Sequence, residues 1–178
     1  MPRTALIVVD MLNAYDHPDA EKLTQSVEQT LPTMARLIER AADEAALTIY
    51  VNDNFGEWTS NRDDLLRTAL EGKFRHLVEP IAPRDDTLFV VKARHSIFYQ
   101  TPLEYLLGEE DVDRVVLVGQ VTEQCILYSA LDAYIRKFQV VVPRDAVAHI
   151  HEDLADASLR MMEINMAAEI VDADDVKF

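Results

Sequence analysis

Three reactive side chains follow three apolar runs of the sequence. Asp10 comes directly after TALIVV, Lys92 directly after TLFVV, and Cys125 lies six residues beyond Gly119, which follows RVVLV. Cys125 is also the only cysteine of the chain. A thiol attacks efficiently only as a thiolate, so it needs a base to take its proton and a cation to favour the anion. These residue types therefore predict nucleophilic catalysis by a cysteine.

The elements that position these side chains alternate between two patterns. Most of the short β-branched runs are apolar on successive residues, which is typical of strands buried on both faces in a parallel sheet. The segments 31–45, 122–137 and 153–167 repeat apolar residues at helical spacing. This alternation predicts an α/β fold, a three-layer α-β-α sandwich with a mostly parallel sheet. The six predicted strands are residues 4–9, 47–51, 87–91, 114–118, 138–142 and 168–171.

The carboxyl ends of parallel strands form one edge of a sheet, and ligands bind there. We therefore expect Asp10, Lys92 and Cys125 to meet at that edge. Cys125 would lie in the first turn of a helix, where the helix dipole and Lys92 favour the thiolate. Asp10 can accept the thiol proton and pass it to a leaving group. The backbone N–H of Cys125, with another from the preceding turn, can stabilise an oxyanion.

With these residues in place, the sequence resembles the isochorismatase-like cysteine hydrolase superfamily, which includes nicotinamidases and N-carbamoylsarcosine amidohydrolases. The resemblance covers nearly the whole chain. Around the cysteine it resembles, in order and spacing, the family pattern of glycine, a hydrophobic residue, any residue, threonine, two residues and cysteine. The blocks that carry it are TALIVVDMLNAY, VKARHSIFYQTPLEYLL, VVLVGQVTEQCILYSALDAY and VVVPRDAVA.

The resemblance implies a catalytic triad of Asp10, Lys92 and Cys125, with an acyl-enzyme on the cysteine. It implies a cis peptide bond between Gln120 and Val121, and an oxyanion hole made by the N–H groups of Val121 and Cys125. It also implies a six-stranded doubly wound sheet and a homodimer or homotetramer. The expected reaction is cleavage of a C–N bond in a small amide or a carbamoyl or ureido compound, with no cofactor.

Two departures from the family pattern bear on the substrate. Gln120 stands where a hydrophobic residue is more common, which affects the shape of the oxyanion cradle. Nicotinamidases carry a metal-binding Asp-x-His after the second strand, whereas this chain reads Asp53, Asn54, Phe55, so we expect no metal site. Two alternatives stay open: a vinyl ether hydrolase that uses Asp10, as in isochorismatases without the cysteine, and a catalytically inactive member that serves as a binding module.

The polar segment 52–73 is the expected substrate-covering loop of a single domain that spans residues 1–178. Four aromatic residues are candidates for the wall of a substrate pocket: Phe55, Trp58, Phe98 and Tyr99. The pair His149 and His151 has the spacing of metal ligands on an extended segment, but we expect it to lead into a helix.

Composition narrows the classes of partner. The net charge is −15, from 17 basic and 32 acidic residues, which disfavours nucleic acids and anionic membranes. No apolar stretch has the length of a membrane helix, and the first residues lack the apolar core of a signal peptide. A single cysteine forms no internal disulfide. We therefore expect a cytoplasmic protein with a small-molecule substrate.

Overall fold

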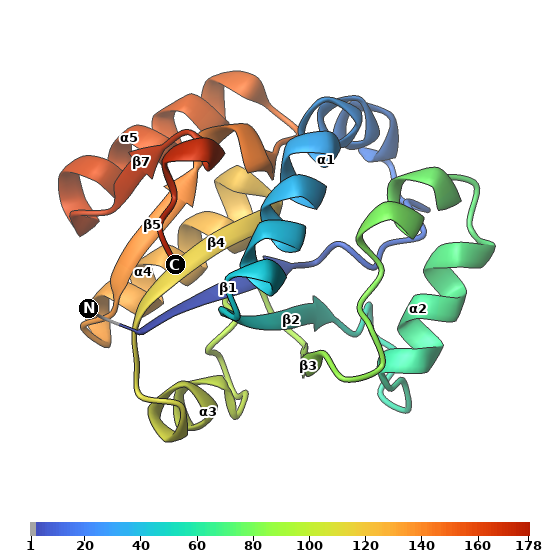
Figure 1. Cartoon of the computed structure of the whole chain (residues 1–178). Coiled ribbons are helices and arrows are strands. Elements are labelled where there is room, and N and C mark those ends of the chain that lie inside the picture. Colours follow the sequence, from blue (N-terminus) through green and yellow to red (C-terminus); the bar gives the residue numbers. More distant parts are fainter. Residues whose placement is uncertain (1–2) are drawn as a thin grey trace.

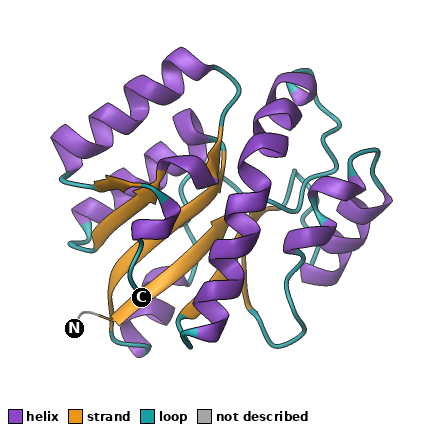
Figure 2. Ribbon diagram, turned by 45° about the horizontal axis from the view of Figure 1, so that its top comes forward, coloured by secondary structure: helices purple, strands orange, loops and turns teal. Residues whose placement is uncertain are grey.

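The centre of the sheet is strand β1 (Arg3–Val9), in the computed structural model that describes residues 3–178. Its side chains alternate between two helical layers because successive residues of a strand point to opposite faces. Leu6 and Val8 pack into one hydrophobic core, while Ala5, Ile7 and Val9 pack into the other. Figure 2 shows the strands enclosed by helices on both sides. The predicted three-layer α/β class is confirmed.

The sheet has seven strands, and every strand pair in it is parallel. Its order is β3-β2-β1-β4-β5-β7, with β6 paired to β4. The six predicted strands are all present, and the prediction missed only the two-residue β6. Beyond β1, the strands are β2 (Leu47–Asp53), β3 (Leu88–Lys92), β4 (Val112–Gln120), β5 (Gln139–Pro143), β6 (Val147–Ala148) and β7 (Glu169–Val171).

Two helices, α1 and α2, pack on one face of the sheet, and three, α3, α4 and α5, pack on the other. Figure 1 shows α1 lying over the central strands. The α-helices are α1 (Ala20–Asp43), α2 (Arg62–Glu71), α3 (Leu103–Glu109), α4 (Leu127–Ile135) and α5 (Glu152–Met166). A π-helical turn covers Thr122–Ile126, and 3-10 turns cover Arg75–Leu77, Glu79–Ile81, Arg144–Ala146 and Ala173–Asp175.

Helix α1 is longer than the sequence pattern indicated. We expected a helix over 31–45 with Pro32 near its first turn, but the helix begins at Ala20 and Pro32 lies inside it. Proline removes one helical hydrogen bond and strains the preceding turn. Leu23, Val27 and Leu31 extend the buried face across this point, so their burial offsets the cost of the proline.

The topology brings the carboxyl ends of the strands to one edge of the sheet. The chain moves outward from β1 to β2 and β3, then returns to the other side of β1 as β4. This reversal creates a crevice between β1 and β4, the position where doubly wound sheets bind ligands. Among the described residues, no helix has the length and apolar character needed to cross a membrane.

Candidate active site

The ammonium group of Lys92 is the centre of the site. Its Nζ lies 2.9 Å from Oδ2 of Asp10 and 3.7 Å from Sγ of Cys125. A second carboxylate, that of Asp53 at the end of β2, lies 3.2 Å away. The side chain of Lys92 is fully buried, so its charge is compensated by these groups and not by water. Residues from β1, β2, β3 and the segment after β4 therefore meet at one nitrogen.

Asp10 is held from three directions. It has a φ of 55°, a left-handed conformation that aspartate adopts more readily than most residues, and its N–H donates to the carbonyl of Val51 at 3.0 Å. Its Oδ1 accepts a hydrogen bond from the N–H of Asp53 at 2.7 Å. Its backbone carbonyl accepts one from Nε2 of Gln120 at 2.6 Å. These contacts leave Oδ2 directed at Lys92.

Gly119 allows β4 to pass close to β1 before the chain turns toward the cysteine. Its φ is +114°, and an added Cβ would lie 2.2 Å from the carbonyl oxygen of Val9, so no other residue fits here. The next peptide bond, between Gln120 and Val121, is cis. The π-helical turn then places Cys125 at the sheet edge, with 9% of its surface exposed.

The environment of the thiol differs from the expectation. Burial is the largest influence on Cys125 and raises the pKa of its thiol; the negative charge of Asp10 raises it further, and Lys92 opposes them. Burial likewise raises the pKa of Asp10, against the charge of Lys92. Burial is the largest single influence on Lys92 and disfavours its charged form, but the charge and hydrogen bond of Asp10, together with Cys125 and Asp53, outweigh burial and raise the pKa of Lys92. The resting thiol is therefore protonated at neutral pH, and Lys92 is charged.

His95 is a neighbour of the thiol that the sequence prediction missed. Its Nδ1 lies 4.0 Å from Sγ of Cys125, and its ring meets that of Tyr128 edge-on at 5.4 Å between centroids. In the sequence, its position three residues beyond Lys92, in the polar segment after β3, could have indicated that it lies near the thiol. The thiol therefore has both the ammonium of Lys92 and an imidazole as neighbours.

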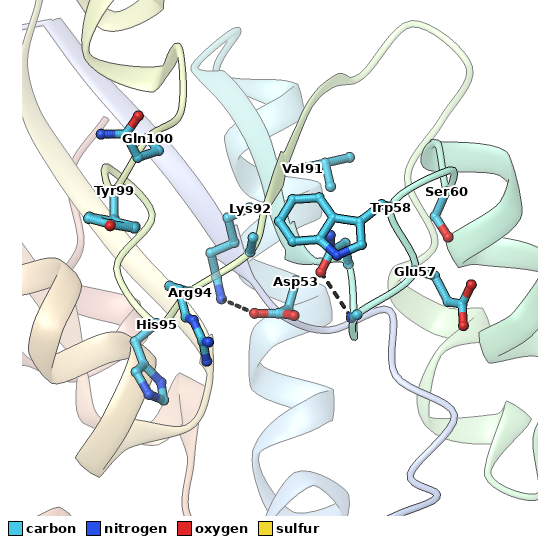
Figure 3. Close-up of a pocket in the computed structure, with 13 residues that line it drawn as sticks. Asp53, Glu57, Trp58, Ser60, Val91, Lys92, Arg94, His95, Tyr99 and Gln100 are labelled. Atoms are coloured by element: carbon cyan, nitrogen blue, oxygen red, sulfur yellow. Dashed lines mark hydrogen bonds and ion pairs between the residues drawn. The ribbon is translucent and has the colours of Figure 1, made fainter.

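A cavity of about 860 Å³ opens beside Lys92 and has the size of a small-molecule site. Figure 3 shows its two walls, one formed by the segment after β2 and the other by the segment after β3. The first wall includes Asp53, Asn54, Gly56, Glu57, Trp58 and Ser60, and the second includes Lys92, Arg94, His95, Tyr99 and Gln100. The part of the predicted covering loop from 53 to 60 thus borders this cavity.

The four aromatic residues suggested for the pocket do not lie together. Trp58 and Tyr99 line the main cavity, on its opposite walls. Phe55 lines a neighbouring cavity of about 290 Å³ instead. Phe98 lines neither of them: it is buried and stacks on Phe138, with centroids 5.8 Å apart. It belongs to the hydrophobic core on the side of the sheet that α3, α4 and α5 cover.

The two histidines of the H-x-H pair have separate surroundings. The imidazole of His149 contacts the hydroxyl of Ser26 on α1, at 3.2 Å from its Nδ1. The N–H of His151 donates to Oε1 of Glu123, which helps to fix the chain before α5. Within residues 3–178, no three acidic, histidine or cysteine side chains gather in a way that could hold a metal ion.

Comparisons with known proteins agree on one family. A model of the isochorismatase domain matches residues 4–175. An uncharacterized isochorismatase family protein of Bacillus subtilis (strain 168), YaaI, is 31% identical over 172 residues, 97% of this chain and 95% of that protein. A maleamate amidohydrolase of Pseudomonas putida is 29% identical over 88% of this chain and 78% of its own length. The crystal structure of an N-carbamoylsarcosine amidase from Thermoplasma acidophilum superposes with a TM-score of 0.77, at 26% identity and 100% coverage of both chains.

Proposed function

The chain belongs to the isochorismatase family, and we propose that it is a cysteine hydrolase that cleaves the C–N bond of a small amide or of a carbamoyl or ureido compound. The observation that carries this proposal is the shared ammonium of Lys92, which lies within 4 Å of both the carboxylate of Asp10 and the sulfur of Cys125. Relatives named as amidohydrolase and amidase support the reaction class.

In the first step, Asp10 takes the proton of the Cys125 thiol while sulfur attacks the carbonyl carbon of the substrate. A carboxylate whose pKa is raised by burial is a stronger base than an exposed one, so it suits this transfer. Asp10 then gives the proton to the nitrogen as the C–N bond breaks. The amine leaves, and the acyl group stays on sulfur as a thioester.

In the second step, water attacks the thioester carbon and loses a proton to Asp10. The sulfur leaves as a thiolate, Lys92 stabilises its charge, and the proton returns from Asp10 to sulfur. The oxyanion of both steps is assigned to the N–H groups of Val121 and Cys125. One such donor contributes roughly 3 kcal/mol to the stabilisation of an oxyanion.

The vinyl ether reaction is the less supported alternative. It uses the aspartate and requires no thiol, whereas here Cys125 contacts both Lys92 and His95. A binding module without catalysis is likewise less supported, because burying Asp10 and Lys92 together is costly and a purely structural site gains little from such a pair.

Ammonia release from a panel of small amides and ureides tests the proposal. We expect the wild type to release ammonia, and Cys125→Ala to release none while its far-UV circular dichroism spectrum is unchanged. Release by Cys125→Ala at the wild-type rate would exclude the cysteine nucleophile. No cofactor enters either step, so we expect full activity after exhaustive chelation with EDTA.

A further inference from the structure

We propose that Arg94 binds a carboxylate group of the substrate, so that the substrate class is a small amide or ureide that also carries a carboxylate. This inference rests on the proposed hydrolase function and narrows it. The site consists of the guanidinium of Arg94 in the main cavity, next to the Lys92 ammonium at which the reacting groups meet.

Arg94 lies on the same wall of the cavity as Lys92 and His95. It follows Lys92 by two residues, its side chain is exposed, and it lines the cavity. Figure 3 shows its guanidinium beside His95, the imidazole that contacts the sulfur of Cys125. Arg94 therefore lies in the cavity that opens beside Lys92 at the end of β3.

The charge of Arg94 is uncompensated, unlike that of Lys92. Lys92 is neutralised by Asp10 and Asp53. Arg94 makes no ion pair or side-chain hydrogen bond with any residue in the range 3–178, although the protein carries a large excess of acidic groups. Most arginines of the chain do pair with carboxylates, namely Arg3, Arg40, Arg62, Arg67, Arg75, Arg114, Arg136 and Arg144.

Of the remaining arginines, Arg36 donates to the hydroxyl of Thr33. Arg84 and Arg160 have neither an ion pair nor a side-chain hydrogen bond within the described part of the chain, and they border surface hollows that contain none of the reacting groups. Among the arginines of residues 3–178, Arg94 alone is both unpaired and part of the lining of the active-site cavity. The planar fork of a guanidinium matches a carboxylate with two parallel hydrogen bonds, which makes a carboxylate its best ligand among small-molecule groups.

The charges along the cavity also set the direction in which the ligand binds. Glu57 lies on the opposite wall, where its charge disfavours a carboxylate. The substrate carboxylate is therefore directed to the Arg94 side.

Binding of two nearly isosteric ligands tests the carboxylate site. Succinamate carries one amide and one carboxylate, whereas succinamide carries two amides. Isothermal titration calorimetry in the Cys125→Ala background, where no acyl-enzyme forms, separates binding from turnover. We expect succinamate to bind more tightly than succinamide, and Arg94→Gln to weaken succinamate binding at least tenfold while leaving succinamide unchanged.

Two further variants control for charge and shape. Arg160→Gln removes the same charge from α5, far along the chain from the cavity, and we expect it to leave succinamate binding unchanged. Arg94→Lys keeps the charge but loses the fork, so we expect an affinity between those of wild type and Arg94→Gln. Three results would each overturn the proposal. Arg94→Gln could bind succinamate as tightly as its parent, Arg160→Gln could lose as much succinamate affinity as Arg94→Gln, or succinamate could fail to bind at millimolar concentration.

Turnover in the wild-type background distinguishes failure of the subsite from failure of the proposed function. If succinamate acylates Cys125 in preference to succinamide, and Arg94→Gln loses this preference, the carboxylate site and the hydrolase function are both supported. Equal acylation by the two compounds in wild type and in Arg94→Gln overturns the substrate class and leaves the hydrolase standing. Binding that depends on Arg94, without acylation by any amide, supports the carboxylate site and contradicts the hydrolase.

Discussion

Replacing Lys92 with methionine removes the charge at the centre of the site and keeps most of the side-chain volume. Lys92 is fully buried, and its ammonium lies 2.9 Å from Asp10 and 3.2 Å from Asp53. Asp10 is itself only 6% exposed, so Lys92→Met leaves a carboxylate without its counter-ion in the interior. Breaking a buried ion pair in this way costs about 3–5 kcal/mol. A domain has only about 5–15 kcal/mol of stability, so the loss is readily measured.

The stability lost in Lys92→Met is expected to depend on pH, and the direction of this dependence follows from the pKa of Asp10. Burial raises the pKa of Asp10 and the charge of Lys92 opposes this, so removing Lys92 raises that pKa further. A carboxyl group with a raised folded-state pKa costs no stability below its unfolded pKa of about 3.9, and its cost grows as pH rises toward the folded pKa. We therefore expect the deficit of Lys92→Met to be largest at neutral pH and to shrink as pH falls toward 4.

Urea denaturation between pH 4 and 8, followed by far-UV circular dichroism, measures this deficit. Fluorescence is a poor choice because the single tryptophan, Trp58, is 81% exposed. Lys22→Met on the exposed surface of α1 is the matched control and should change stability by less than about 0.5 kcal/mol. In the double variant Asp10→Asn/Lys92→Met, part of the stability should return. A deficit under about 1 kcal/mol at pH 7, or one that is the same at all pH values, would refute the buried ion pair.

Three further predictions concern the thiol, the glycine and the surface. Asp10→Asn removes a charge that raises the pKa of Cys125. Alkylation of the thiol by iodoacetamide should therefore shift to lower pH, while turnover falls by at least about two powers of ten. An unshifted alkylation profile would contradict the assigned charge effect. Gly119→Ala forces a Cβ to 2.2 Å from the carbonyl oxygen of Val9 and should abolish folding or lower the urea midpoint sharply, and a wild-type midpoint would contradict the close approach. Helices α4 and α5 pack together and expose Ile135 and Ile164. We therefore predict that the protein self-associates and that Ile135→Asp reduces this association, as measured by sedimentation velocity. A monomeric wild type would exclude self-association through this surface.

The strands and the positions of Asp10, Lys92 and Cys125 could be predicted from the sequence because both depend on local pattern. A buried parallel strand is apolar on successive residues, and its carboxyl end is visible where a polar residue follows. The strand β6 was missed because a strand of two residues is too short to show a recognisable pattern of apolar residues. The start of α1 was missed because Pro32 resembled a boundary, and only the packing of Leu23 and Val27 shows that the helix continues before it.

Other features of the site depend on contacts between distant segments and could not be predicted. Gln120 departs from the family pattern, yet it binds the carbonyl of Asp10 from across the sheet edge. The raised pKa of the Cys125 thiol reflects burial and the charge of Asp10, whereas the sequence drew attention to the helix end and Lys92. The burial of Phe98 depends on its stacking partner Phe138, which is 40 residues away.

Mass spectrometry of the enzyme during turnover tests the central claim most directly. The wild-type chain is mixed with a substrate found in the ammonia-release panel, quenched in acid within milliseconds to seconds, and measured intact and after digestion. The account predicts a transient mass increase equal to the acyl group, located on the peptide that contains Cys125 and absent from Cys125→Ala. Steady hydrolysis by an enzyme that stays unmodified at every quench time, with Cys125→Ala equally active, would contradict it.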